Sequence, residues 1–221
     1  VAVYMSYGFV PNPVFIWSTG NNGLLGSMLA LLFIAMGLGG WWLDREAWHK
    51  QGWILRQTGR SPTDFVDQAG MGPSLLNMGL TGALGTAYVL AVGSDLNGPT
   101  LGAIFTIVGF SAFGKHPRNI VPIMLGVFIA SMLKDWSADD PSAVLAALFG
   151  TTLAPIAGRF GWRWGIVAGF VHSSVAQTVG QLHGGLVLYN NGFAAGLVAA
   201  ILVPVIIALQ PVAKPGPGAP R

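Results

Sequence analysis

Residues 22–43 read NGLLGSMLALLFIAMGLGGWWL and establish the class of the protein. This stretch carries no charged side chain, and about 20 consecutive apolar residues are what an α-helix needs to cross a bilayer. Six further apolar segments follow, at residues 72–94, 98–114, 119–134, 142–158, 164–182 and 191–209. We therefore expect an all-α integral membrane protein with about seven transmembrane helices. The segments 98–114 and 119–134 are short enough to be partly re-entrant.

The composition of the whole chain supports this class. Of the 221 residues 52% are hydrophobic and 9% are charged, whereas a soluble domain carries about 25% charged residues. The chain has no cysteine, which excludes disulfides, thiolate metal sites and cysteine nucleophiles. Its net charge of +3 is scattered between apolar segments, so we expect the lipid bilayer as its partner and no nucleic acid.

The basic residues predict the orientation of the chain. Seven crossings place ten of the eleven Lys and Arg side chains on one side of the membrane and Lys134 alone on the other. Because cytoplasmic loops collect Lys and Arg, we expect the start of the chain outside and its end in the cytoplasm. The predicted location is an inner (plasma) membrane, which the chain crosses several times.

The apolar segments divide the chain into five expected parts. These are an extracytoplasmic lead-in at 1–21, a first helix at 22–43, a basic cytoplasmic loop with an amphipathic helix at 44–71, a helical bundle at 72–210 and a disordered tail at 211–221. The loop contains a helix start, Ser61-Pro62-Thr63-Asp64. The sequence opens on Val-Ala-Val-Tyr rather than Met, so a longer polypeptide is expected.

An Asn-Gly pair opens three of the apolar segments, at Asn22, Asn97 and Asn191. Asn is a good N-cap and Gly allows a close approach of the backbone, so such a helix start can point N–H groups at a polar solute. The structural alternative is that each pair simply ends a loop and caps a helix.

Other polar groups fall inside or between the apolar segments. Pro155 within the fifth segment removes the hydrogen bond that the carbonyl of Thr151 would accept, and His172 begins a polar stripe in the sixth. The candidate pore or substrate residues are Asn97, Gly98, Pro99, Thr100, Thr106, Ser111, Thr151, Thr152, His172, Gln177, Asn190, Asn191 and Gly192. The candidate cytoplasmic mouth is formed by Lys115, His116 and Arg118.

These residues favour transport over catalysis. No Asp or Glu lies inside a segment to complete a proton relay with His172, so the sequence favours a channel or transporter for a small neutral or weakly polar solute. The alternative is a non-transporting subunit of a larger membrane complex, structural or associated with a cofactor. An enzyme using His172 or His116 as a base is a third possibility, but the common catalytic and phosphate-loop motifs are missing. No cofactor and no metal are expected.

Four long motifs carry a resemblance to a known family. They are residues 95–100, 108–119, 148–155 and 182–196. Over roughly residues 60 to 205 the chain resembles the second half of a bacterial membrane-protein family catalogued as domain of unknown function 1576. The resemblance implies two related halves in one polypeptide, so the expected partners are the missing N-terminal half or another copy of the chain, in an oligomer. The stretch from Tyr189 to Gly196 is also similar to a Tyr-x-Asn-Gly stretch of urea transporters, which implies that small neutral solutes are worth testing.

Overall fold

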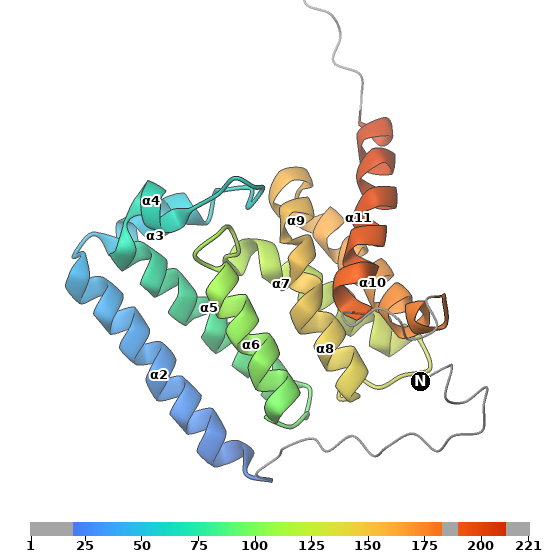
Figure 1. Cartoon of the computed structure of the whole chain (residues 1–221), viewed down its shortest axis with the longest axis horizontal. Helices are drawn as coiled ribbons and strands as arrows, with labels where there is room; N and C mark the ends of the chain where they lie inside the picture. The colour runs from blue at the N-terminus through green and yellow to red at the C-terminus, as the bar shows by residue number, and fades with distance from the viewer. Residues whose placement is uncertain (1–19, 183–189, 211–221) are drawn as a thin grey trace, which may run out of the picture.

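The structure is a computed structural model that describes residues 20–182 and 190–210, and within these ranges the chain forms helices and no strand. The predicted tail at 211–221 and all but the last two residues of the predicted lead-in lie outside the described residues. The helices are α2 (Asn22–Leu43), α3 (Ala47–Ile54), α4 (Phe65–Ala69), α5 (Met71–Ala91), α6 (Gly98–Phe110), α7 (Pro117–Leu133), α8 (Pro141–Gly150), the 3₁₀ turn η1 (Thr151–Leu153), α9 (Ala154–Phe160), α10 (Trp162–Leu182) and α11 (Asn190–Leu209) (Figure 1).

All seven segments predicted from the sequence are helical, but they differ in length and polarity. Four stretches are long and apolar enough to cross a membrane: α2, α5, α8 to α9 taken together, and α11. At 1.5 Å per residue, α6 and α7 are about 20 and 25 Å long, less than the roughly 30 Å of a hydrocarbon core. Among the described residues the structure thus supports four candidate spans. The other three predicted crossings are not confirmed, because α6 and α7 are short and α10 carries the polar stripe around His172.

The helices pack as a row with a second group at one end. In Figure 1, α2, α5, α6 and α8 lie side by side, and each contacts the next in the row. The helices α7, α10 and α11 complete the bundle around α8 and α9. The main apolar core lies between α5, α6, α7 and α8, where Ile104, Ile120 and Leu148 are fully buried.

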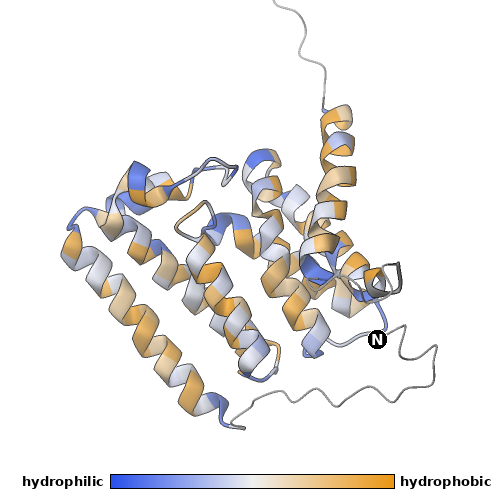
Figure 2. Cartoon of the chain, in the orientation of Figure 1, coloured by the Kyte–Doolittle hydropathy of each residue, from blue (hydrophilic) through white to orange (hydrophobic). Residues whose placement is uncertain are grey.

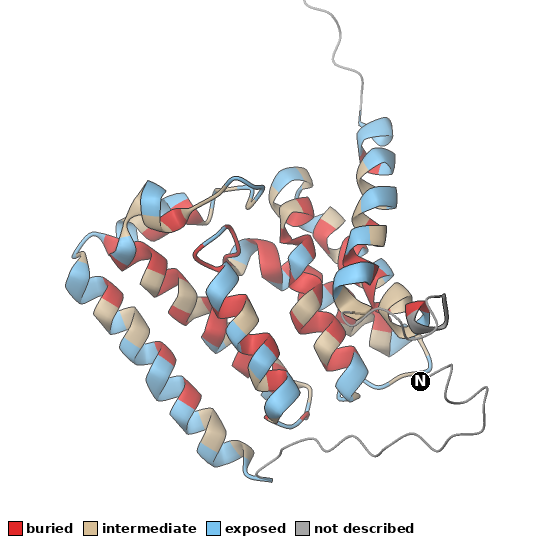
Figure 3. Cartoon of the chain, in the orientation of Figure 1, coloured by how far each residue is buried: buried red, intermediate tan, exposed pale blue. Residues whose placement is uncertain are grey.

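The outermost helices expose apolar surface. Only 17% of the apolar window of α2 and 22% of that of α11 is buried within the chain, against 61% for α8 to α9. Hydrophobic residues dominate α2 and α11 in Figure 2, and exposed residues dominate the same two helices in Figure 3. Such helices are stable in a bilayer, where the lipid covers their apolar side chains.

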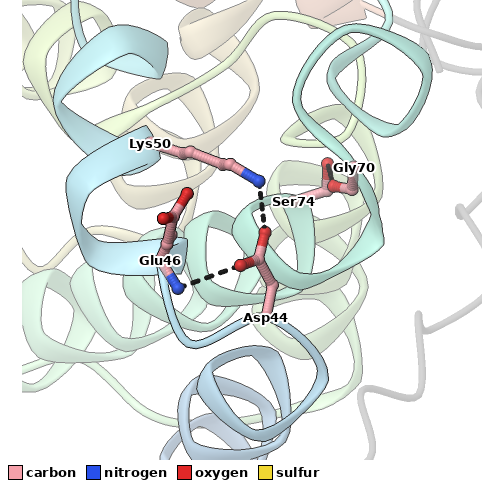
Figure 4. A network of polar contacts seen from close by, with 5 residues as sticks. All are labelled: Asp44, Glu46, Lys50, Gly70 and Ser74. Carbon is pink, nitrogen blue, oxygen red and sulfur yellow. Dashed lines mark hydrogen bonds and ion pairs between the residues drawn. The ribbon is translucent and has the colours of Figure 1, made fainter.

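The turn between α2 and α3 is fixed by an ion pair. Lys50 Nζ lies 2.7 Å from Asp44 Oδ2, and the backbone N–H of Glu46 donates to Asp44 Oδ1 over 2.9 Å (Figure 4). The hydrogen bond from Lys50 lowers the pKa of Asp44. Next to this turn, the Ser74 hydroxyl donates to the carbonyl of Gly70 at the start of α5. Lys50 therefore differs from the other basic residues of this loop, because it has a carboxylate partner within the described structure.

Glycines allow α7 and α10 to touch through their backbones. A Cβ added to Gly126 of α7 would collide with the carbonyl of Ile166 and come within 2.8 Å of the Phe170 nitrogen. A Cβ added to Gly169 of α10 would meet the backbone of Ile123 in the same way. The glycine spacing in α10 therefore serves a close helix crossing, the role that small residues have in membrane bundles.

Replacing Gly126 by Ala should destabilise the bundle, because backbone atoms of α10 would have to move. We expect Gly126→Ala to lower the free energy of unfolding in detergent by about 1–3 kcal/mol. The control is Gly109→Ala in α6, where an added Cβ has nothing within 4 Å; it should be neutral or stabilising by up to about 1 kcal/mol. An equal effect of the two substitutions would contradict the close crossing.

Candidate functional site

A break in a long apolar helix forms the centre of the site. The stretch Pro141–Phe160 is one candidate span, yet it runs as α8, one 3₁₀ turn and α9. Pro155 cannot donate a backbone hydrogen bond and its ring excludes a regular α-helix one turn earlier. The carbonyl of Thr151 accepts from the backbone N–H of Ala154 instead, and the Thr151 hydroxyl donates to the carbonyl of Leu148 over 2.6 Å. The predicted kink at residues 150–155 is therefore a real interruption near the middle of this span.

Lys115 reaches this break from the turn between α6 and α7. Its Nζ donates to Thr151 Oγ1 over 2.8 Å and lies 5.2 Å from the centre of the Phe110 ring. The side chain is only 8% exposed. Burial lowers the pKa of Lys115 to about 8. Two residues predicted separately, at the mouth and in the pore, thus form one direct contact.

A cavity of about 200 Å³ opens beside this contact. Lys115 and Thr152 line it together with Phe110 at the end of α6, Phe113 of the following turn and Pro155 of α9. Thr152 is exposed and Thr151 is fully buried. The Thr151 hydroxyl is occupied by Leu148 and Lys115, so Thr152 is the hydroxyl that faces the cavity with its bonding capacity open to a ligand.

The turn 111–116 that carries Lys115 is held by buried amides. Asn77 of α5 is fully buried, and its Nδ2 donates to the carbonyls of Ser111 and Lys115, each over 2.8 Å. Its Oδ1 accepts from Gln51 Nε2 over 2.9 Å. On the other side of the turn, Asn119 Nδ2 donates to the carbonyl of Gly114. These bonds fix the backbone on both sides of Lys115.

The loop after α3 closes over this turn. A Cβ on Gly59 would lie 2.5 Å from the carbonyl oxygen of Gly114, so the two backbones are in contact. Both glycines have positive φ, +69° and +117°, which other residues rarely adopt. The buried ring of His116 hydrogen-bonds the carbonyl of Gln57 through Nε2 at 2.9 Å. Burial lowers the pKa of His116.

A second polar cluster lies at the end of α8, where α10 and α11 pack against it. The ring of His172 on α10 is fully buried and packs against Gly150, where an added Cβ would come within 2.7 Å of it. The side chain of Asn191 on α11 interacts with this ring. Within residues 20–182 and 190–210, however, neither ring nitrogen of His172 nor Oδ1 of Asn191 makes a hydrogen bond of normal geometry. The structure thus places three predicted residues, Thr151, His172 and Asn191, around the end of α8.

The Asn-Gly helix starts have different surroundings. Asn97 and Thr100 form a reciprocal capping box at the start of α6, and Asn22 ties the start of α2 to the backbone of Ser94 and Leu96. The arrangement at Asn97 matches the structural alternative of helix capping. The N-cap of α2 is Asn21, so Asn22 does not cap its helix but holds it to the loop 94–96. Helix α6 packs on α5 and α8, whereas α11 packs on α8, α9 and α10. Asn97 and Asn191 thus begin helices that lie on different sides of α8.

The remaining predicted residues are spread over the bundle. Thr106 is partly exposed and donates to the carbonyl of Gly102 within α6. Ser111 belongs to the buried network, where it accepts from Thr81, and Gln177 donates to Ser142. Asn190, the first residue of α11, is partly buried. Exposed surface positions are taken by Gly98, Pro99, Arg118 and Gly192.

Sequence reasoning missed Asn77 and the contact of the 57–60 loop with the turn. Asn77 had a signal, since it is the one Asn or Gln in the segment 72–94. An amide inside an apolar helix must find a partner, because an unpaired polar group is costly there. No sequence signal indicated the contact between the loop and the turn, because Gly59 and Gly114 are far apart in sequence.

Removing the Asn77 amide should loosen the turn. We expect Asn77→Leu to lower the free energy of unfolding in detergent by about 1–3 kcal/mol for each buried group left unpaired. Gln177→Leu is the matched control, because that amide donates one bond at the surface and should cost about 1 kcal/mol or less. Thermal unfolding of both variants measures the difference. Equal losses would contradict the anchoring role of Asn77.

A comparison with known proteins identifies the family but no activity. No curated protein and no solved structure shows a significant match to the chain. The model of one protein family, described as protein of unknown function (DUF1576), matches residues 43–208. This range includes α3 to α10, the turn 111–116 and the helix break, so the chain belongs to the DUF1576 family.

Proposed function

We propose that the protein is a membrane channel or transporter for a small polar solute, and that the solute passes the break between α8 and α9. The observation that carries this proposal is the 200 Å³ cavity at the break, lined by Lys115 and Thr152 within a candidate span. Interrupted helices that bring polar side chains to the middle of a membrane are a common construction of transporter sites. A purely structural subunit has no need for a buried lysine at such a place.

The charges at the break support a solute that is not a cation. No Asp or Glu lines this cavity, and Lys115 contributes a positive charge. The sequence favours a neutral or weakly polar solute for the same reason, the lack of acidic side chains in the apolar segments. A positively charged solute would meet repulsion from Lys115 with nothing to offset it.

The proposed topology places the loop 44–70 and the turn 111–116 on the cytoplasmic side of a bacterial plasma membrane. The distribution of Lys and Arg supports this orientation. Because α6 and α7 are short, the turn between them is recessed from that side behind the loop that carries Gly59, and from there Lys115 reaches the break. The exposed apolar faces of α2 and α11 suit lipid, and also a second half of the protein or another copy of the chain.

Solute uptake into proteoliposomes tests the proposal. The full chain is reconstituted, and uptake of urea, glycerol and acetate is compared for the native sequence, Thr152→Val and Thr106→Val. We expect uptake of at least one solute above that of empty liposomes. Thr152→Val should reduce it about fivefold to tenfold, since a hydrogen bond to the passing solute is lost.

Thr106→Val is the matched control, because this threonine bonds within α6 and does not line the cavity. Its uptake should equal that of the native sequence. If no solute enters, or if Thr152→Val and Thr106→Val behave alike, the proposed path is wrong and the role as a subunit of a larger membrane complex becomes the better account.

A further inference from the structure

Three cationic side chains gather around the helix break without a carboxylate partner. Lys115 lines the cavity described above. A neighbouring cavity of about 280 Å³ is lined by Arg60 and Arg159, and it shares Thr152 and Pro155 with the first. In the part of the chain that the structure describes, the one ion pair joins Lys50 to Asp44. The positive charge at the break is therefore uncompensated by any described acidic residue.

Lys115 is the least satisfied of the three. An ammonium group has three hydrogens to donate, and in the described residues Lys115 Nζ donates to the Thr151 hydroxyl alone. The Phe110 ring 5.2 Å away adds a weak cation–π contact. Burying a charge is costly unless it is paired and hydrogen-bonded. An oxygen-bearing anion in the cavity would supply both the opposite charge and the missing acceptors.

We propose that the cavity binds a compact oxyanion, of carboxylate or phosphate type, which accepts hydrogen bonds from Lys115 and Thr152. Arg60 and Arg159 in the adjoining cavity attract the anion and raise its local concentration. Thr151 acts as a positioning residue, since its hydroxyl holds the ammonium against the break. The size of the cavity limits the ligand to a small group with few accompanying waters.

This inference deepens the proposed function and rests on it for the role of the anion as the transported solute. The binding itself is independent of transport. The oxyanion has two possible sources, a free solute or the phosphate of an anionic lipid. These share the same recognition chemistry, and the experiment separates them.

The rate of reductive methylation of Lys115 by formaldehyde and sodium cyanoborohydride reports the occupancy of the cavity. Only the neutral amine reacts, and burial already lowers the pKa of Lys115 to about 8. An anion beside the ammonium raises this pKa, and a rise of one unit reduces the neutral fraction at pH 7 roughly tenfold. We therefore expect sodium phosphate or sodium acetate to slow methylation of Lys115 about tenfold in the full chain in neutral detergent.

Lys134 is the internal control in the same sample. It also donates to a hydroxyl, that of Ser174, and lies near the rings of Trp136 and Phe170, but it does not line either cavity. Its rate should be unchanged by the anions. Mass spectrometry of proteolytic peptides gives both rates from one digest.

A pair of arginine variants tests the adjoining cavity while leaving Lys115 in place. Arg159→Gln should weaken the protection of Lys115 about twofold to fivefold. Arg163→Gln is the matched control, because Arg163 contacts Trp162 and lines neither cavity. Equal protection in the two variants would remove Arg159 from the site and overturn that part of the proposal.

Nanodiscs separate the two sources of the oxyanion. Protection by free phosphate or acetate in nanodiscs of neutral lipid identifies a soluble ligand. Protection in phosphatidylglycerol nanodiscs alone identifies a lipid headgroup at the same site. If none of these slows methylation of Lys115 relative to Lys134, the site does not bind oxyanions and the inference is wrong. The assay measures no flux, so its failure is distinguishable from a failure of the uptake experiment.

Discussion

The side-chain amide of Asn77 bonds two carbonyls of the turn 111–116, and the position of Lys115 depends on these bonds. The amide lies inside α5, where water cannot replace a lost hydrogen bond. The turn therefore has one low-energy place against α5. From that place the lysine side chain extends to Thr151 at the break of α8. One buried amide thus links α5, the α6–α7 turn and the interrupted helix.

This construction places positive charge where membrane proteins usually avoid it. Lys115 is buried and faces a hydroxyl rather than a carboxylate, and the arginines of the adjoining cavity add to the same potential. Burying an ammonium group without an opposite charge costs free energy, and a bound anion would offset this cost by pairing with it. The His172 and Asn191 cluster beside Gly150 adds buried polar atoms that make no hydrogen bond of normal geometry within the described residues. The polar path that we propose through the break would account for both clusters.

Helix positions were predictable from the sequence because hydropathy acts locally. The segment 22–43 coincides with α2, and 191–209 begins one residue after α11 does. The break at Thr151 followed from Pro155, again a local effect. The pairing of Lys115 with Thr151 was not predictable, because it depends on which helices meet and how long α6 and α7 are. As a lone amide in an apolar segment, Asn77 could have been predicted to need hydrogen-bond partners. Which residues these are could be known only from the fold.

Cysteine accessibility tests most directly whether water reaches the break. The chain has no cysteine of its own, so a single introduced thiol is the only reactive one. We expect Thr152→Cys in intact membranes to react with a small hydrophilic thiol reagent, and phosphate or acetate to slow that reaction. Thr106→Cys, on the partly exposed face of the apolar helix α6, should react far more slowly because the thiolate does not form in lipid. Slow reaction of Thr152→Cys, equal to that of Thr106→Cys, would contradict a water-filled path at the break.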